Sequence, residues 1–181
     1  MKKIPSFFLL IFGLELIFLA VYFKKIERTK DQPLGRQDLL LTQKESSSFF
    51  LSPDSGEFSL NEEFTVLIML STGQKPIIGA DAILKYDPQK LAVLEILPGD
   101  IFGVYPQEKI ADGKILISGI LQSKEGFSGQ GVLAKTKLRG KMSGETRLSF
   151  EFTPGRTDDS NLTAAGKDTL ARTENGLYTF K

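Results

Sequence analysis

The chain has 181 residues, enough for one domain with a core, and its 23 Lys and Arg against 22 Asp and Glu create no overall field that would attract nucleic acid. It contains no His and no Cys, which excludes the usual general base near neutral pH, the thiolate nucleophile and the common zinc, haem and iron–sulfur ligands. Carboxylate chemistry, as in glycosidases, and an oxygen-liganded calcium site stay open.

Residues 1–25 are predicted to form a membrane anchor. From Ile4 through Phe12 to Phe23 runs an apolar segment of about 20 residues, the length of a helix that crosses a bilayer, with lysines on both flanks. A cleavable signal peptide usually has a shorter apolar run, and the residues after Ala20 form a poor cleavage site. We expect an uncleaved transmembrane helix; a secreted protein is the alternative. Glu15, near the middle, is either an acid that the helix tolerates or one that faces a partner helix.

Residues 26–48 are predicted to be a linker. The stretch "ERTKDQPLGRQDLLLTQKESSS" mixes both charges with Pro, Gly and Ser and shows no sustained period. We expect it to tether the anchor to a domain that covers residues 49–181. Basic residues on both sides of the anchor leave its orientation open by the charge rule.

The domain has the pattern of an all-β protein. In "EFTVLIMLST" apolar residues alternate between two faces, as in a strand buried on one side. Turn residues separate further runs of this kind, and Asp112-Gly113 is the clearest hairpin signal. Many short strands without a soluble helix predict a β-sandwich or jelly roll. The further runs are Ala80–Tyr86, Leu91–Ile96, Lys114–Ile120, Gly131–Leu138, Thr146–Phe152 and Leu177–Phe180.

The stretch "GADAILKYDPQKL", residues 79–91, places a carboxylate within one of these strands. Alternation puts Ala80, Ala82, Leu84 and Tyr86 on the face toward the core. Pro88 cannot donate to a ladder, so the strand ends before it. The opposite, outward face is predicted to carry Gly79, Asp81, Ile83 and Lys85.

Several strings resemble the cohesin domain, the receptor module by which bacterial scaffolding proteins hold enzymes that carry dockerins. They are "GADAILKYDPQKLAVLEILPGDIF", "GKILISG", "FSGQGVLAKTKLRG" and "TRLSFEF", and the resemblance covers about Phe49 to Phe180. It implies an antiparallel sandwich of about nine strands with jelly-roll topology and no catalytic activity. It also implies that a dockerin, a small calcium-loaded helical module, docks on the sheet face that contains Asp81.

The resemblance nominates the residues of that face. Asp81 matches an aspartate that often bonds dockerin hydroxyls, and Gly79 stands where better-known members often have Asn. Gly119 and Gln122 stand about where they have an apolar and an acidic contact residue. With Ile83 and Lys85 these residues are the expected partner-binding set. An alternative interpretation, equally favoured for Asp81, is that it is a solvated surface charge. Ile83 is alternatively a single exposed apolar residue without a binding role.

Two other functions compete with that of a membrane-tethered cohesin-like receptor. A polysaccharide-binding module of the related fold is the alternative, although the chain has no Trp and four Tyr to form an aromatic platform. An enzyme is not expected, because no spacing nominates a catalytic carboxylate pair. We expect no cofactor: Asp158, Asp159 and Asn161 offer calcium-binding oxygens but lack the spacing and terminal Glu of a known loop. The resemblance places the domain outside the cell, where it binds a dockerin-bearing or other extracellular protein.

Overall fold

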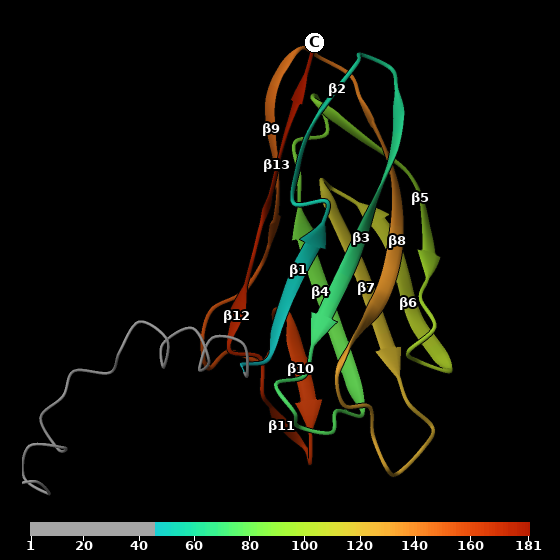
Figure 1. Ribbon diagram of the computed structural model, residues 1–181, viewed down its shortest axis with the longest axis vertical. Coiled ribbons are helices and arrows are strands. Elements are labelled where there is room, and N and C mark those ends of the chain that lie inside the picture. The colour runs from blue at the N-terminus through green and yellow to red at the C-terminus, as the bar shows by residue number, and fades with distance from the viewer. Residues whose placement is uncertain (1–45) are drawn as a thin grey trace, which may run out of the picture. The chain divides into compact units, whose positions relative to one another are not determined.

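Alternating apolar and polar side chains produce the strands of this domain, whose residues 46–181 are described by a computed structural model (Figure 1). Nine strands have five or more residues and four are shorter. They are β1 (Ser48–Ser52), β2 (Ser55–Phe58), β3 (Glu63–Ser71), β4 (Gly79–Lys85), β5 (Leu91–Pro98), β6 (Val104–Ala111), β7 (Lys114–Ile120), β8 (Gln130–Gly140), β9 (Gly144–Phe150), β10 (Asn161–Ala164), β11 (Lys167–Asp168), β12 (Arg172–Thr173) and β13 (Gly176–Phe180).

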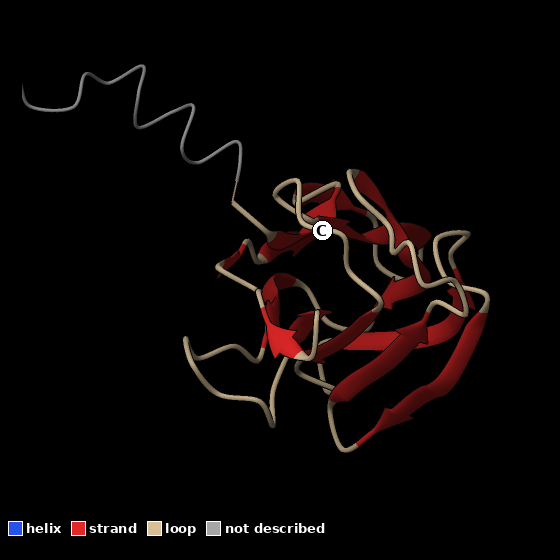
Figure 2. Ribbon diagram, turned by 90° about the horizontal axis from the view of Figure 1, so that it is seen from below, coloured by secondary structure: helices blue, strands red, loops and turns tan. Residues whose placement is uncertain are grey.

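The strands form two sheets that face each other, and Figure 2 shows them from below. The first sheet has the order β12-β1-β3-β8-β5. The second has the order β11-β10-β4-β9-β13-β2, with β7 beside β4 and β6 beside β7. Most pairs are antiparallel, while β1 pairs with β12 and β13 with β2 in parallel. The predicted all-β sandwich is therefore confirmed, with mixed sheets.

The membrane anchor predicted for residues 1–25, including Ile4, Phe12, Glu15 and Phe23, lies outside the described residues. So does nearly all of the linker predicted for residues 26–48. Within residues 46–181, no helix has the length and apolar character needed to span a bilayer. The anchor and its orientation therefore stay predictions.

The core lies between the sheets and consists of the inward side chains of both. Val66, Ile68 and Leu70 of β3 and Ala82 and Leu84 of β4 are fully buried. Burial of side chains of the size of Val, Ile or Leu stabilises the fold by about 1.5–3 kcal/mol each.

One end of the core is an aromatic cluster of Phe58, Phe64, Tyr178 and Phe180. The rings of Phe58 and Phe64 stack with centroids 3.9 Å apart, and Tyr178 lies 5.5 Å from Phe64. The Tyr178 hydroxyl donates a hydrogen bond to the Pro53 carbonyl at 2.8 Å, which gives the buried polar atom a partner.

The predicted hairpin at Asp112-Gly113 connects β6 to β7. Ala111 pairs with Lys114 across the turn, and Asp112 and Gly113 have φ angles of 52° and 72°. Two successive positive φ angles are the requirement of a type I′ turn, which matches the right-handed twist of the strands. The hairpin makes β6 the outer neighbour of β7.

Gly119 is the predicted site residue whose direction differs from the expectation. It pairs with the inward Ala80 and is buried. The space for a Cβ at Gly119 lies 2.3 Å from the Phe102 ring, so only glycine fits beneath this ring. Gly119 therefore belongs to the inner face and does not reach the outward face that carries Asp81.

Gly119→Ala is expected to lower the free energy of unfolding by about 1–3 kcal/mol, because the methyl group forces Phe102 to move in a packed core. Urea denaturation followed by circular dichroism measures the change. Gly103→Ala is the matched control, since a Cβ there meets no atom within 4 Å. Equal stability of the two variants would contradict the inward placement of Gly119.

Candidate functional site

The outward face around β4 is the candidate site. Its central strand presents Gly79, Asp81, Ile83 and Lys85 outward, as predicted, and these residues alternate with the buried Ala80, Ala82 and Leu84. One edge of β4 pairs with β7 along its whole length. The other edge pairs with β10 at Gly79–Asp81 and with β9 at Leu84–Lys85. This surface, called the β4 face below, comprises Gly79, Asp81, Ile83, Lys85, Gln107, Lys109, Lys114, Leu116, Ser118, Ile120, Asn161 and Thr163.

Asp81 lies in the middle of the β4 face between polar neighbours. It pairs across the strands with Asn161 on one side and Ser118 on the other. A hollow of about 210 Å³ opens here, lined also by Gln107, Ile83 and the segment Thr157–Asp159. The arrangement places a carboxylate, an amide and a hydroxyl beside an apolar side chain, which suits hydrogen bonding with a docked protein.

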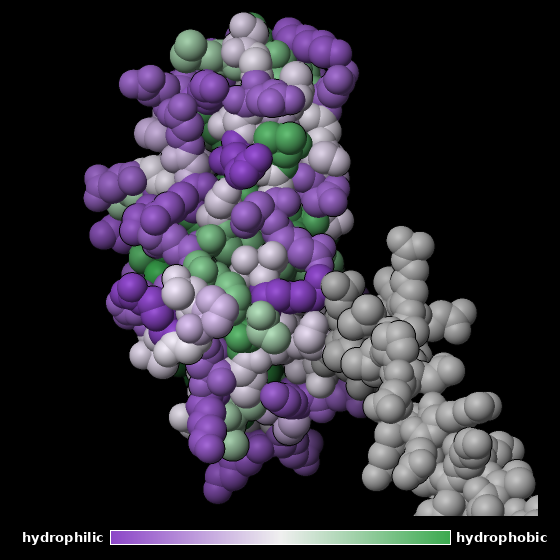
Figure 3. Space-filling model, turned by 90° about the vertical axis from the view of Figure 1, so that its left-hand side faces the viewer, coloured by the Kyte–Doolittle hydropathy of each residue, from purple (hydrophilic) through white to green (hydrophobic). Residues whose placement is uncertain are grey.

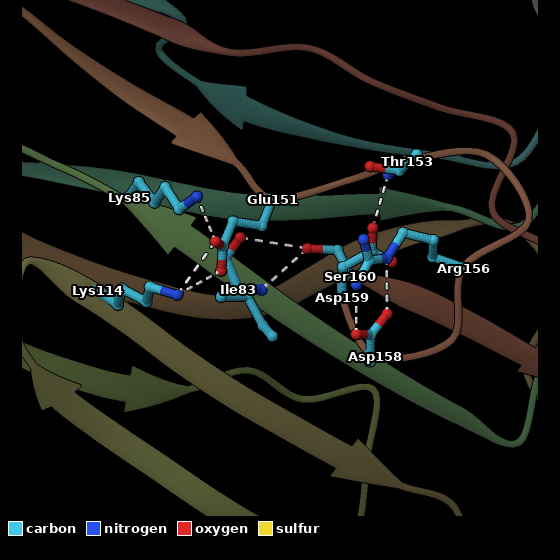
Figure 4. A network of polar contacts seen from close by, with 9 residues as sticks. All are labelled: Ile83, Lys85, Lys114, Glu151, Thr153, Arg156, Asp158, Asp159 and Ser160. Atoms are coloured by element: carbon cyan, nitrogen blue, oxygen red, sulfur yellow. Dashed lines mark hydrogen bonds and ion pairs between the residues drawn. The ribbon is translucent and has the colours of Figure 1, made fainter.

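The segment of residues 151–160, called the strap below, connects β9 to β10 and closes the edge of β4 between them (Figure 4). At this point the Ile83 carbonyl accepts a hydrogen bond from the Glu151 amide at 2.7 Å. The buried Ser160 hydroxyl accepts from the Ile83 amide at 3.0 Å and donates to the Ile83 carbonyl at 3.2 Å. Both main-chain groups of Ile83 are thereby paired, which holds its side chain outward.

Glu151 ties the strap to two lysines of the β4 face. Its carboxylate contacts Lys85 of β4 and accepts from Lys114 of β7 at 2.9 Å and 3.1 Å, as Figure 4 shows. Burial alone would raise the pKa of the Glu151 carboxyl, but the hydrogen bonds and charges of Lys85 and Lys114 outweigh it and hold this pKa below its ordinary value. The three side chains connect β4, β7 and the strap.

The three residues considered for calcium do not combine into a ligand set. Arg156 donates to both oxygens of the Asp158 carboxylate, one of them at 2.8 Å, and lowers the pKa of Asp158. The Thr153 amide donates to Oδ2 of Asp159 at 2.6 Å, whereas Oδ1 of Asp159 is buried without a hydrogen-bond partner. Oδ1 of Asn161 accepts from the Thr163 hydroxyl at 3.3 Å. Residues 46–181 contain no group of three or more acidic side chains placed to hold a metal ion.

The remaining predicted site residues, Gln122 and Gly119, do not join Asp81 on the outward surface. Gln122 is exposed in the loop after β7, beside a second hollow of about 490 Å³ at the end of the sheet. Gly119 faces the core, so its outward neighbours are Ser118 and Ile120. These two residues, with Leu116 and Gln107, were missed as candidates. Alternation in "KILISGI" was the available signal for Ser118 and Ile120.

Figure 3 views the side of the domain drawn on the left of Figure 1, where β9 and β13 lie, and shows mainly hydrophilic side chains with apolar groups between them.

The exposed apolar residues of the domain include Ile78, Val104 and Ile120. Ile120 and Val104 pair with each other across β7 and β6, and Ile120 also pairs with Gly79. Apolar surface is therefore present at one end of the β4 face.

Comparison with known proteins identifies the fold to which these strands belong. A family model described as the cohesin domain matches residues 51–172, and no curated protein matches the chain. The seventh ScaB type I cohesin of Pseudobacteroides cellulosolvens is similar at 21% identity and a TM-score of 0.60, over 75% of this chain and 92% of that one.

Two further solved structures have the same fold. The OlpC cohesin of Clostridium thermocellum, solved in a type I cohesin–dockerin complex, has 16% identity and a TM-score of 0.61, over 75% of this chain and 94% of that one. A non-cellulosomal cohesin from the archaeon Archaeoglobus fulgidus has 16% identity and a TM-score of 0.57, over 75% and 91% of the two chains.

Glu151→Gln is expected to lower the free energy of unfolding by about 1 kcal/mol near neutral pH, since the variant loses a partly exposed ion pair with two lysines. The pKa of Glu151 is lowered in the folded state. The contribution of its carboxylate to the free energy of unfolding is therefore fully present above the ordinary pKa of 4.5, and it is lost as the pH falls through the folded-state pKa. The two proteins should therefore converge in stability as the pH falls from 4.5 through the lower folded-state pKa. Urea titrations at several pH values, with the exposed Glu108→Gln as control, measure this; a difference that stays constant with pH would contradict it.

Proposed function

This chain belongs to the cohesin domain family, and from that premise we propose that its β4 face docks a dockerin module carried by another protein. The chain would then act as a non-catalytic receptor. The observation that supports this most directly is the position of Asp81, which lies outward in the middle of a sheet face beside a hollow with polar and apolar walls. The OlpC cohesin of similar fold was solved with a dockerin bound, which agrees with such a role.

The β4 face offers the two kinds of contact that a docking site needs. Asp81, Ser118 and Asn161 supply acceptors and donors to polar groups of the partner. Ile83 and Leu116 are half-buried apolar neighbours on β4 and β7, and they form a contact from which water can be excluded. In protein interfaces a few such central residues carry most of the binding energy, surrounded by contacts of small individual effect.

The strap contributes rigidity to this face. The main chain of Ile83 is paired on its strap side by Glu151 and Ser160, so the side chain is already positioned before a partner arrives. Preorganisation of this kind lowers the entropy lost on association. The strap also forms one wall of the hollow beside Asp81 through Thr157, Asp158 and Asp159.

No feature of the described residues favours polysaccharide binding. Sugar-binding faces usually present aromatic rings, and the outward positions of β4, β7 and β10 carry none. Tyr178, an aromatic residue of the domain, is fully buried in the core. Retention of the chain on an insoluble polysaccharide is therefore one of the results that would contradict the docking function in the test below.

Asp81→Lys and Ile83→Asp are each expected to weaken dockerin binding at least tenfold, because each removes a central contact and leaves a charge opposite the partner. The measurement is isothermal titration of the purified full-length chain in detergent with each dockerin module encoded in the same genome. Glu95→Lys is the matched control on the other sheet.

Two results would overturn the proposal. One is that no dockerin binds the wild-type chain. The other is retention on insoluble cellulose that survives both Asp81→Lys and Ile83→Asp, which would point to polysaccharide instead. Circular dichroism of the variants establishes that loss of binding does not come from loss of the fold.

We also propose that residues 1–25 anchor the chain in the membrane with the sandwich outside the cell. The length and apolar character of Ile4–Phe23 support the span, and the docking function supports the orientation. A tether of this kind would raise the concentration of the bound partner at the cell surface.

The full-length chain should stay in the membrane fraction after an alkaline wash, and protease added to intact cells should digest the domain. A chain without residues 1–25 is the control and should not be retained in that fraction. Recovery of the full-length chain in the wash, or protection of the domain from protease, would contradict the tether or its orientation respectively.

A further inference from the structure

The outward face of the first sheet carries a continuous apolar patch. The strands β1, β3, β8 and β5 lie side by side in this sheet (Figure 1). Val66, Ile68 and Leu70 of β3 are fully buried, so the residues between them point away from the core. The apolar side chains that point outward from the four strands form a surface, called the β3 patch below, which consists of Phe50, Leu67, Met69, Val132 and Leu97.

Strand pairing joins the residues of the β3 patch into one surface. Met69 lies directly between Phe50 of β1 and Val132 of β8. In the neighbouring row, Lys135 lies between the patch leucines of β3 and β5. The patch is most exposed at Leu97, whose exposed fraction is 46%. Single exposed apolar residues are normal on a protein surface, whereas an apolar patch that spans several strands indicates an interaction site.

Charged side chains of both signs lie at one end of the same face. Arg139 of β8 pairs with Glu63 of β3, and Lys137 of β8 pairs with Glu95 of β5. Lys137 also forms an ion pair with Glu63 at 2.6 Å. The bases therefore lie on β8 and the acids on the strands beside it. A face of mixed charge suits a protein partner, whereas an anionic membrane attracts a face that is uniformly basic.

This distribution of charge makes the face complementary to a second copy of itself. A two-fold axis along the strands, between β3 and β8, would place β3 of one copy over β8 of the other, with each row facing the same row. Glu63 of each copy would then face Arg139 of the other copy. Met69 would face Val132 of the other copy in the same way, so the apolar rows also meet.

The face is large enough for a stable dimer. At about 4.8 Å between strands and 3.3 Å per residue, four strands over the eight residue steps of β3 cover roughly 500 Å² in projection. Projecting side chains add to the accessible surface, which therefore approaches the roughly 800 Å² per partner of a stable complex. The β3 patch lies in the middle of this area, between the charged end and the polar Ser71 and Gln130. An apolar centre with a polar rim is typical of protein interfaces.

We propose that two copies of this chain associate through their β3 patches into a two-fold symmetric dimer, with the two first sheets packed face to face. The β4 face belongs to the second sheet, on the other side of the core, so both β4 faces of the dimer point outward. The dimer therefore presents two binding faces, and an assembly with two suitable modules binds both of them with increased avidity. Self-association does not depend on what the β4 faces bind.

Lys135 limits the strength of this contact. It pairs with Leu67 in its own copy, so in the dimer it also faces Leu67 of the other copy. Its stem packs on apolar surface, but its ammonium group loses water on association. Lys135→Met keeps a long flexible side chain and removes the charge. This variant is expected to tighten the dimer at least tenfold, because the change acts once in each copy. An unchanged or weaker dimer would contradict the interface.

Met69→Lys is expected to weaken the dimer at least tenfold, because it places ammonium groups at the centre of the interface. Sedimentation equilibrium of the purified full-length chain in density-matched detergent measures the dissociation constant. Leu116→Lys, an outward and half-buried position on the second sheet, is the matched control and leaves this constant within twofold. A wild-type chain that stays monomeric would overturn the proposal and leave the patch to a different protein or to lipid. A dimer that survives Met69→Lys would overturn it as well.

Charge exchange tests the arrangement of the two copies. Glu63→Arg and Arg139→Glu each place like charges opposite one another across the axis, so each variant alone is expected to dissociate at least tenfold more readily. A mixture of the two variants pairs opposite charges at both positions and is expected to restore the dimer. Circular dichroism establishes that both variants are folded. If the mixture fails to associate while the wild-type chain does, the two-fold arrangement along the strands is wrong.

Discussion

The pairing of the Ile83 main chain is the constraint on which the β4 face depends. A strand inside a sheet must satisfy its amide and carbonyl groups on both edges, and β4 has two different neighbours on one edge. Between them the Glu151 amide and the Ser160 hydroxyl complete the ladder at Ile83. Without these bonds the amide and carbonyl groups of Ile83 would need water molecules as hydrogen-bond partners at a half-buried position. The strap therefore makes β9, β4 and β10 behave as one surface and fixes the direction of the side chains on it.

The sequence was most informative where apolar and polar residues alternate without ambiguity. In Gly79–Lys85 the small and apolar residues fall on one face, so the outward direction of Asp81 follows from local pattern alone. Asp112-Gly113 likewise predicts its hairpin, because few residue pairs accept two positive φ angles. In "KILISGI" only Lys114 and Ser118 are polar, so the alternation that turns Gly119 inward is a weaker signal. The Phe102 ring that covers Gly119 comes from another part of the chain, which local pattern does not reveal.

Some residues of the site could not be predicted from the sequence, because strands that are far apart in the chain pair in the fold. Asn161 lies beside Asp81 only because β10 pairs with β4, and the two residues are far apart in the chain. Asp158, Asp159 and Asn161 offer calcium-binding oxygens close together in the sequence, although without the spacing of a known loop. In the fold Ser160 points inward among them, Asp158 pairs with Arg156 and Asn161 faces outward. The membrane anchor, in contrast, is a prediction from composition and length that rests on no described residue.

The position of β13 has a consequence for how the domain acquires its structure. This strand lies between β9 and β2, and Leu177–Phe180 pairs with residues 55–58 across more than a hundred residues of chain. A chain that is delivered from its N-terminus therefore exposes the unpaired edge of β2 until β13 is available. Such non-local closure slows folding and prolongs the exposure of unpaired edges. The sheet can close only after residue 180 has reached the compartment in which the domain folds.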